Sequence, residues 1–359
     1  MRLLMLAPAS AVHTQRWANG FAERGVDVHL ACLDEHLTGA DPLDERITVH
    51  PLAGSGQLAY FRQAPTVARL ARALRPDVVN AHYASGYGTV LRFSRVRPAI
   101  LSAWGSDVFE FPDRGPLQRR LVTGNLRFPR VVTSSSEIMA ARIATVTAGR
   151  VTPVVIPFGV DLGRFHPEPD ARPDRPLRFG IVKTLEPHYR IDVVVDAFAR
   201  HLQGRDPAAA TLDVYGGGSL LADLQAQAAR LGVADRVSFH GAIPHQQVPA
   251  ALRELDVFLL ASETESFGVA AVEAMACGIP VLASDAPGFV EVLDGGRHGL
   301  LYPRGDADAL ARLMSTLADD PAERLRLRTA GLAGAARYDW QDCLTRMVDL
   351  LAATAQPAR

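Results

Sequence analysis

Short apolar runs rich in β-branched residues alternate with longer amphipathic stretches along the chain. Alternation of this kind predicts parallel strands that are covered by helices. In the first half, strands are predicted at residues 3–7, 26–32, 47–50, 78–81, 99–103, 131–134 and 154–156. Helices are predicted there at residues 14–24, 57–74, 87–95 and 137–147. Gly25 follows the first of these helices, where a left-handed glycine readily ends a helix.

The segment 161–176 interrupts this alternation. It holds four prolines and few apolar residues, which is typical of a linker. After it, strands are predicted at residues 177–182, 211–215, 237–240, 257–261, 280–284 and 299–302. Helices fall between them, and the chain finishes with three predicted helices, at residues 306–318, 322–333 and 340–352.

Two series of strands separated by one linker predict an α/β protein with two doubly wound, Rossmann-like domains facing across a cleft. The predicted domains are residues 1–160 and 177–340, joined by the linker 161–176. Residues 341–359 are expected to form a C-terminal helix, for which packing back on the first domain is one option. Because ligands bind beyond the carboxyl ends of parallel strands, each domain offers a place for one substrate.

The balance of charge narrows the classes of partner. With 38 Lys and Arg against 39 Asp and Glu, the chain has a net charge of -1, which argues against binding nucleic acid through bulk electrostatics. Residues 1–167 hold 19 Arg against 13 acidic residues, and the remainder holds 19 basic against 26 acidic residues. The basic first half indicates either an anionic ligand or surface, or merely solvated faces of different composition.

The three cysteines, Cys32, Cys277 and Cys343, stand far apart and without CxxC spacing. The sequence therefore predicts neither a disulfide framework nor a zinc site. The opening segment is too short for the apolar core of a signal peptide, and no run of about 18 apolar residues is present. From these features we expect a cytoplasmic protein.

Residues 61–75 combine four arginines with apolar residues at helical spacing. The arginines are Arg62, Arg69, Arg72 and Arg75. Such a segment is compatible with peripheral contact between the N-terminal domain and the inner face of an anionic membrane. It is equally an ordinary domain helix with an arginine-rich outer face.

The segment 263–281 carries the most informative chemistry. It follows the predicted strand 257–261 and opens a helix near Gly268, whose unpaired N–H groups would suit a diphosphate. Gly268 permits a close approach of the backbone to that ligand. Glu273 lies about five residues into the helix, where a carboxylate can accept two ribose hydroxyls, and Glu265 lies in the preceding loop, near sugar hydroxyls. The alternative is a surface loop and an amphipathic helix with two incidental acids.

This segment resembles the donor-site signature of glycosyltransferase family 4, with Glu265 and Glu273 as its pair of glutamates and a Gly-Ile-Pro-Val run behind them. Other segments resemble the family in the same order, at residues 156–165, 215–219, 239–244 and 286–291. The resemblance covers nearly all of residues 151–305. It implies a GT-B fold with an N-terminal acceptor-binding domain and a C-terminal nucleotide-sugar-binding domain.

The resemblance also implies roles for individual residues. The donor-binding positions are Gly216, Gly217, Ile243, Ser266, Phe267, Gly268, Val269 and Glu273. Lys183 stands where the family has a base that neutralises the leaving diphosphate, and the family's second base falls on His188, with Arg190 two residues further on. We predict that Arg190 binds the diphosphate, because a guanidinium forms a bidentate fork with phosphate. His188 either shares this role or is a surface histidine. Glu265 joins Lys183 and Arg190 in the predicted catalytic set, as a sugar-binding residue.

The first domain departs from the family in two places. The loop after the first strand lacks the Gly-Gly of many relatives, and Trp104 stands where many have a histidine that touches the transferred sugar. On the acceptor and sugar side the predicted residues are Ser10, His13, His82 and Asp107. His82 either replaces the missing histidine or is a structural residue.

The resemblance implies a retaining glycosyltransferase that needs no metal and no cofactor, and no Asp-x-Asp stands out as a metal site. The expected partners are a UDP- or GDP-sugar donor and a glycan or lipid-linked acceptor of the cell envelope, and no nucleic acid is expected. Two other functions stay open at this point. One is a nucleotide-sugar epimerase of the same architecture, and the other is a non-catalytic protein that binds nucleotide sugars.

Overall fold

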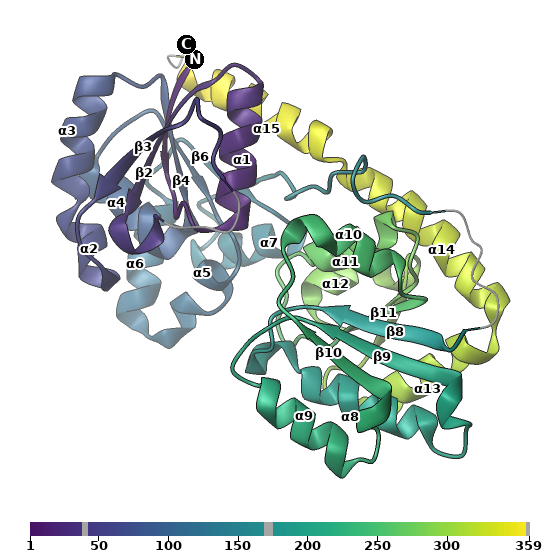
Figure 1. The fold of residues 1–359 in the computed structure, drawn as a ribbon. Coiled ribbons are helices and arrows are strands. Elements are labelled where there is room, and N and C mark those ends of the chain that lie inside the picture. The colour runs from purple at the N-terminus through teal and green to yellow at the C-terminus, as the bar shows by residue number, and fades with distance from the viewer. Residues whose placement is uncertain (38–41, 169–174, 357–359) are drawn as a thin grey trace. The chain divides into compact units, whose positions relative to one another are not determined.

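A computed structural model describes residues 1–37, 42–168 and 175–356 of the chain (Figure 1). It divides the chain into two compact units. Unit 1 comprises Met1–Phe158 together with Gln341–Arg359, and unit 2 comprises Gly159–Trp340. The predicted linker 161–176 thus falls within unit 2, and its residues 169–174 lie outside the described part.

Unit 1 is built on a seven-stranded parallel sheet with the strand order β3-β2-β1-β4-β5-β6-β7. Its strands are β1 (Arg2–Leu6), β2 (Asp27–Leu33), β3 (Thr48–Leu52), β4 (Val78–His82), β5 (Ala99–Ser102), β6 (Val131–Ser134) and β7 (Val154–Val155). Each strand overlaps one of the seven predicted strands, so this part of the prediction is confirmed. The strands β4 and β5 are buried along their whole length, as expected for a sheet covered on both faces.

The helices of unit 1 follow the strands in alternation. They are α1 (Val12–Glu23), α2 (Gly56–Arg62), α3 (Ala64–Leu74), α4 (Gly88–Ser94), α5 (Ser106–Phe109), α6 (Pro116–Leu126), α7 (Glu137–Val146) and most of α15 (Trp340–Ala355). Single 3-10 turns cover Asp34–His36 and Phe111–Arg114, and a turn of π-helix covers Tyr83–Tyr87. Gly25, with φ of 77°, ends α1 as predicted.

Two helix predictions for this unit were wrong or incomplete. The single helix expected at 57–74 is broken at Gln63 into α2 and α3, because Pro65 starts a new helix and cannot donate a backbone hydrogen bond to the preceding turn. The helices α5 and α6 were not predicted at all. The apolar face of α3 buries Val67 and Ala71 in unit 1, which supports the interpretation of its arginines as the outer face of a domain helix.

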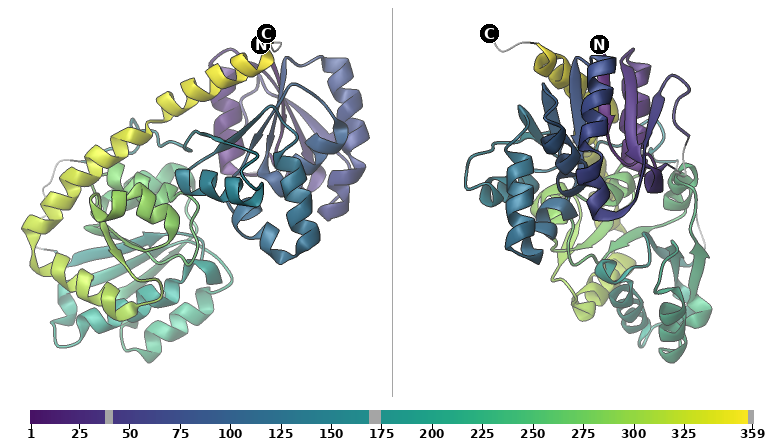
Figure 2. Two further views of the ribbon diagram at one scale, coloured as in Figure 1. Left: turned by 180° about the vertical axis from the view of Figure 1, so that it is seen from behind. Right: turned by 90° about the vertical axis from the view of Figure 1, so that its left-hand side faces the viewer.

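The C-terminal helix α15 packs on unit 1. Figures 1 and 2 both show its last turns beside α1, near the N-terminus. The guanidinium of Arg24 donates to Gln341 Oε1 at 2.7 Å and to Thr345 Oγ1 at 3.1 Å. Further along the helix, Arg130 donates to the carbonyl oxygen of Thr354 at 3.1 Å. These contacts tie the end of the described chain to elements from its first third.

Unit 2 is built on a six-stranded parallel sheet with the order β10-β9-β8-β11-β12-β13. Its strands are β8 (Leu177–Val182), β9 (Ala210–Tyr215), β10 (Val237–Gly241), β11 (Val257–Leu260), β12 (Val281–Ser284) and β13 (Leu300–Tyr302). All six were predicted. The helices are α8 (Ile191–Leu202), α9 (Leu221–Arg230), α10 (Val248–Arg253), α11 (Val269–Ala276), α12 (Pro287–Val292), α13 (Ala307–Asp319) and α14 (Pro321–Ala335).

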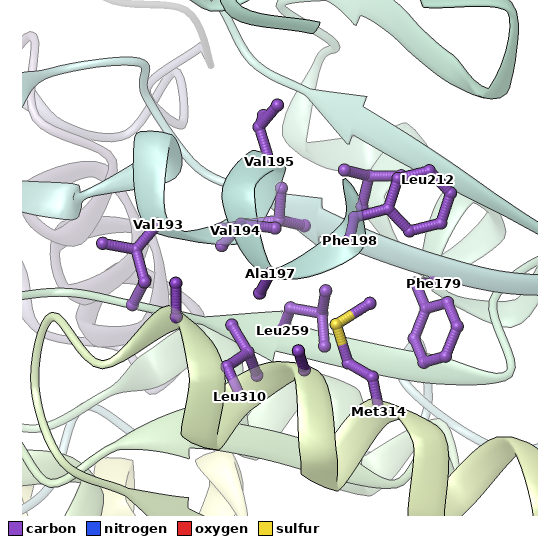
Figure 3. Packing of buried hydrophobic residues seen from close by; sticks show 14 of the residues in the cluster. Phe179, Val193, Val194, Val195, Ala197, Phe198, Leu212, Leu259, Leu310 and Met314 are labelled. Atoms are coloured by element: carbon purple, nitrogen blue, oxygen red, sulfur yellow. The ribbon is translucent and has the colours of Figure 1, made fainter. Parts of the chain in front are cut away.

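The core of unit 2 lies between its sheet and the helices α8 and α13. Figure 3 shows side chains of α8, among them Val194 and Phe198, meeting Leu310 and Met314 of α13 over Leu259 of β11. Both helix pairs are four residues apart, so each lies on one face of its helix. These five side chains are completely buried. Full burial of one such side chain contributes about 1.5–3 kcal/mol.

The strand order of each sheet reverses direction at one point. In unit 1 this switch lies between β1 and β4, and in unit 2 it lies between β8 and β11. The loops that leave two such neighbouring strands run to opposite faces of the sheet and leave a crevice at the carboxyl edge. This edge of each unit is therefore the place to look for a ligand site. None of the described helices is both long and apolar enough to cross a membrane.

Candidate functional site

Lys183 and Glu265 meet at the switch point of unit 2. Lys183 directly follows β8, and Glu265 lies in the loop that follows β11. The Lys183 Nζ atom lies 3.1 Å from Glu265 Oε2, and only 18% and 15% of the two side chains are exposed. Burial alone would lower the pKa of Lys183, but Glu265 and the ring of Tyr189, 4.3 Å from Nζ, raise it overall. The ammonium group therefore stays charged and faces the edge of the sheet.

The glycine-rich turn after β9 holds the backbone around Lys183. A Cβ atom on Gly216 would lie 1.9 Å from the carbonyl oxygen of Lys183, and one on Gly218 would lie 2.5 Å from that of Leu185. The Leu185 N–H donates to the carbonyl oxygen of Gly217 at 3.0 Å. Gly216 and Gly217 were predicted to bind the donor; the structure shows these glycines packed against the strand end that carries Lys183.

The helix α11 starts at the same edge. Gly268 is its N-cap with φ of 99°, and a Cβ atom there would lie 2.8 Å from the ring of Phe289. The Ala271 and Val272 N–H groups are the first to donate within the helix, both to the carbonyl oxygen of Gly268. The N–H groups of Val269 and Ala270 precede them, at the end of a helix where backbone N–H groups have no partner within the helix. Ser266 and Phe267 form the loop that leads into this helix start.

Glu273 lies on the second turn of α11 and is 7% exposed. Its Oε1 atom lies 3.1 Å from Nε2 of His245, in the turn that follows β10. Ile243, which the resemblance places near the nucleotide base, lies two residues before His245 in the same loop. The carboxylate of Glu273 also contributes to the raised pKa of Lys183. The structure thus brings Glu273, the loop of Ile243 and the ion pair of Lys183 and Glu265 to one edge of unit 2.

Arg190 is engaged by two carboxylates. Arg190 is the N-cap of α8 and has left-handed backbone geometry. Its Nε and Nη2 atoms each donate a hydrogen bond to the carboxylate of Asp192 at 3.0 Å. Its Nη1 atom donates to the carboxylate of Glu263. These partners raise the pKa of Arg190. Its guanidinium links the start of α8 to the loop after β11, and the predicted contact with a diphosphate stays a prediction.

His188 contacts the same region through its ring and its backbone. The His188 ring packs on the ring of Tyr189, and the carbonyl oxygen of His188 accepts a hydrogen bond from the N–H of Glu263.

Aromatic rings gather at the switch point of unit 1. Trp104, after β5, has ring contacts with His82 at the end of β4 and with His13 at the start of α1, at centroid distances of 5.2 and 5.7 Å. His13 stacks on Phe158 at 4.1 Å. Ser10 lies in the loop between β1 and α1, and its N–H donates to the carbonyl oxygen of His36. Three of the four predicted acceptor-side residues therefore lie at this edge: Ser10 in a loop, His13 in the first turn of α1 and His82 at the end of β4.

His82 is only 1% exposed, and its Nε2 atom lies 2.7 Å from Asn80 Oδ1. Burial, with a small contribution from His13, lowers the pKa of His82 to about 3, so the ring is neutral. Its Nδ1 atom is buried and has no hydrogen-bond partner among the described residues. The ring of Trp104 contacts this histidine, and the imidazole of His82 is not exposed. His82 therefore does not present an exposed ring in place of the family's sugar-binding histidine.

Asp107, which was predicted on the acceptor and sugar side, lies in α5 after Trp104. Asp107 is completely buried, and its carboxylate accepts hydrogen bonds from the N–H groups of Ala84, Trp104 and Gly105. Burial raises the pKa of Asp107, and these backbone donors oppose the shift. The residue joins the turns after β4 and β5 and thereby positions Trp104.

Sequence reasoning missed three residues of the site in unit 2: Tyr189, His245 and Glu263. Each contacts a residue that was predicted, namely Lys183, Glu273 and Arg190. Each also lies within two residues of a predicted position or at the edge of a resembling segment. Among the described residues, no group of three or more His, Cys, Asp or Glu side chains is arranged to hold a metal ion.

Comparisons with known proteins show the family of this chain. The family model described as "Glycosyl transferases group 1" matches residues 164–333, and the model described as "Glycosyl transferase 4-like" matches residues 2–136. The two matches together take in the sites of both units. The chain belongs to the group 1 glycosyltransferases.

Two relatives of this glycosyltransferase have described activities. It is 32% identical over 237 residues to a GDP-mannose-dependent alpha-(1-6)-phosphatidylinositol monomannoside mannosyltransferase of Mycolicibacterium smegmatis, covering 62% of either chain. It is 33% identical over 246 residues to a D-inositol 3-phosphate glycosyltransferase of Streptomyces avermitilis, covering 64% of this chain and 53% of the relative. The glycosyltransferase thus spans less than two thirds of each of these relatives.

Solved structures establish the fold of this glycosyltransferase. The Anabaena protein HepE in complex with UDP is 20% identical and superposes with a TM-score of 0.80, over 98% of this chain and all of HepE. Sucrose-phosphate synthase from Thermosynechococcus elongatus is 21% identical and also has a TM-score of 0.80, over 98% of both chains. The glycosyltransferase therefore has the α/β GT-B fold that the resemblance implies.

Proposed function

We propose that this protein transfers a sugar from a nucleotide diphosphate sugar to a hydroxyl group of a glycan or lipid-linked acceptor, with retention of anomeric configuration and without a metal ion. The observation that carries the proposal is the presence of a charged, largely covered lysine and of the start of α11 at the same edge of the sheet. Lys183 Nζ, held 3.1 Å from Glu265, and the N–H groups of Val269 and Ala270 face the same edge of unit 2.

The chemistry follows from where charge develops. In the transfer step the bond between the sugar C1 atom and the diphosphate oxygen breaks, and the bond between C1 and the acceptor oxygen forms. The acceptor attacks the face that the diphosphate leaves, so retention needs no nucleophile of the protein. The acceptor proton passes to the departing diphosphate, so no base of the protein is needed either. Donors fixed in advance around the departing oxygens stabilise this charge, and removal of one such donor typically costs about 10²–10³ in rate. Lys183 and the start of α11 fill this role in the proposal, in place of a divalent cation.

Two glutamates, Glu273 and Glu265, are placed to bind the ribose and the sugar of the donor. Glu273, buried on α11 and hydrogen-bonded to His245, is placed to accept the two ribose hydroxyls of the nucleotide. Glu265 pairs with Lys183 in the absence of a donor and is placed to accept hydroxyls of the transferred sugar once the diphosphate takes over the ammonium group. The relatives name GDP-mannose in one case and the HepE structure holds UDP in another, so both nucleotides enter the test.

A thermal-shift panel with UDP, GDP, ADP and their common sugar conjugates, in EDTA, tests the donor site. We expect one nucleotide to raise the melting temperature, and Glu273→Gln to abolish this rise. Glu254→Gln is the matched control, because Glu254 has a half-exposed side chain on the same unit, paired with Arg178. A rise that survives Glu273→Gln, or no rise with any nucleotide, would contradict the donor site.

Turnover separates this proposal from its two alternatives. With the nucleotide sugar identified, release of the nucleotide in the presence of acceptor pools is measured with and without EDTA, and the anomer of the product is read by NMR. Interconversion of the free donor without an acceptor would indicate an epimerase. Binding without turnover on any acceptor would indicate a non-catalytic protein, and an inverted product would contradict retention.

If the acceptor is lipid-linked, the proposal includes peripheral contact between unit 1 and a membrane. The exposed arginines Arg62, Arg69 and Arg72 would supply it. Co-sedimentation with anionic vesicles that falls as salt is raised supports the contact, and no difference between anionic and neutral vesicles contradicts it.

A further inference from the structure

Unit 1 contains a cavity of about 280 Å³ that none of the predicted acceptor residues lines. It lies among the turns that leave β2 and β4 and the helices α2 and α6. Its walls carry four aromatic rings, those of Tyr60, Phe61, Tyr83 and Phe111. The described edge of unit 1 thus offers an aromatic pocket beside the Trp104 cluster, because the ring of Tyr83 also contacts Trp104 at 6.5 Å.

The backbone around this cavity is arranged to present those rings. Tyr83 has φ of 75°, which a residue with a side chain adopts only at a cost of about 1–3 kcal/mol and which clusters at functional sites. It opens a turn of π-helix, another feature often found at such sites. Gly86, within that turn, lets the ring of Tyr60 approach: a Cβ atom on Gly86 would lie 3.0 Å from the Tyr60 ring.

Several polar groups of the wall are already engaged within unit 1. The hydroxyl oxygen of Tyr83 lies 2.6 Å from Ser106 Oγ, and Thr89 Oγ1 donates to the carbonyl oxygen of Ser85 at 2.8 Å. Glu35 accepts a hydrogen bond from the N–H of Gly56 at 3.0 Å. The four aromatic rings are the main apolar binding surface of the pocket.

Arg114 supplies a charge at this pocket. Its side chain is 57% exposed, and its ion pair with Glu110, at 3.8 Å, is exposed and therefore weak. The helices α2, α3, α4 and α6 contain no Asp or Glu and hold six arginines. Three carboxylates lie nearer, those of Glu35 in the wall and of Glu110 and Asp113 beside Arg114. Basic residues therefore outnumber acidic ones around an anion at Arg114.

Exposed apolar side chains surround the pocket as well. Of the eight large hydrophobic side chains that are exposed in the described chain, four lie on the helices around it: Leu58, Phe61, Phe93 and Leu117. Phe61 lines the pocket and packs on Phe93 at 5.1 Å. Leu117 lies one turn before Leu121, another lining residue, and is 79% exposed. Figure 1 shows α2, α4 and α6 together on this part of unit 1.

We propose that this pocket binds the apolar portion of an amphiphilic acceptor, an alkyl or aryl chain that carries an anionic group, with the chain against Tyr60, Phe61 and Phe111 and the anion at Arg114. This inference rests on the proposed glycosyltransferase function and narrows its acceptor class. The aromatic rings and the exposed apolar residues bind the chain, and the acid-free basic helices favour the anion. The acceptor hydroxyl would then stand near Trp104, across the ring of Tyr83.

The test uses octyl phosphate, below its micelle concentration, with the full chain in calorimetric titrations. We expect saturable binding that weakens at least tenfold in Tyr60→Ala and in Arg114→Gln. Arg114→Gln changes an exposed side chain, so a folding defect in Tyr60→Ala would not leave the test undecided. The matched controls are Phe128→Ala and Arg150→Gln, an aromatic ring and an exposed arginine of unit 1 outside both the pocket and the basic helices.

Inorganic phosphate and octyl glucoside separate the two parts of the proposed ligand. Weaker binding of both than of octyl phosphate supports the proposal. Equal binding of inorganic phosphate, equal binding of octyl glucoside, or equal losses in the control variants would overturn it. The nucleotide panel is run on the same variants. Binding of octyl phosphate without any nucleotide response would contradict the donor site and support the pocket. A nucleotide response without binding of octyl phosphate would contradict the pocket alone.

Discussion

The ammonium nitrogen of Lys183 lies 3.1 Å from Oε2 of Glu265, although 82 residues separate the two in the sequence. The strand order explains this, because β8 and β11 are neighbours and both end at the same edge of the sheet. In the proposed function, a diphosphate would take the position at Lys183 that the carboxylate now occupies. Binding of a donor would then exchange one anion for another at Lys183.

Removal of the lysine charge tests this exchange. We expect Lys183→Gln to lower kcat by about 10²–10³, because the charge that develops on the leaving group loses its main cationic partner. Steady-state kinetics with the identified donor measure the effect, and Lys183→Arg, which keeps the charge, should recover part of it. A rise in KM at constant kcat would instead mean that the lysine binds donor and transition state equally.

Gly216 should tolerate no side chain. In Gly216→Ala the new Cβ atom would meet the carbonyl oxygen of Lys183, and we expect a loss of about 1–3 kcal/mol beyond the backbone cost, together with weaker nucleotide binding. Gly204→Ala is the matched control, because Gly204 also has positive φ, of 72°, but nothing lies within 4 Å of its Cβ position. Equal stabilities of the two variants in urea would show that the contact at Lys183 is readily relieved.

Asp107 should affect stability and not the donor. Asp107→Ala leaves three buried N–H groups without their acceptor, so we expect a loss of about 2–4 kcal/mol in the unfolding free energy of unit 1. Urea denaturation followed by tryptophan fluorescence measures this loss. The nucleotide-induced thermal shift should persist, because the residues that produce it lie in unit 2.

His82 should make unit 1 sensitive to acid. Its pKa is about 3 in the folded protein against about 6.5 in an unfolded chain, so the unfolded state binds the proton first. The stabilising effect is complete above pH 6.5 and is lost as the pH falls toward 3. Between pH 7 and pH 5 we expect the wild type to lose about 2 kcal/mol more unfolding free energy than His82→Gln. Parallel pH profiles of the two proteins in urea would mean that His82 gains a proton without unfolding.

The periodicity of the sequence was sufficient for the sheets and insufficient for part of the helical layer. Buried parallel strands are often continuous apolar runs, so β11, with the sequence VFLL, stands out from its surroundings. The region of α5 and α6 gives no such signal, since α6 combines Pro116, a Gly and two arginines with few apolar residues. Its order comes from contacts with α4 and the turn of Phe111–Arg114, which no local pattern reports.

The candidate site divides in the same way. Residues whose role depends on their backbone position, such as Gly268 at the start of α11, follow from the strand–loop–helix pattern. Roles that depend on a partner from elsewhere do not. The sequence predicts Arg190 as a phosphate ligand, and only the fold brings Glu263 to its guanidinium. The sequence predicts Asp107 as a polar group after a strand, and only the fold buries it.

The arrangement of α15 has a consequence for the order in which the protein forms. Residues from Gln341 onward belong to unit 1, yet the ribosome delivers them after the whole of unit 2. Arg24 and Arg130 therefore lack their hydrogen-bond partners in α15 during the synthesis of the second unit. The second unit is free to fold in this period. Unit 1 begins first and is completed last, and during that interval the surface that α15 will cover is open to chaperones and to other chains.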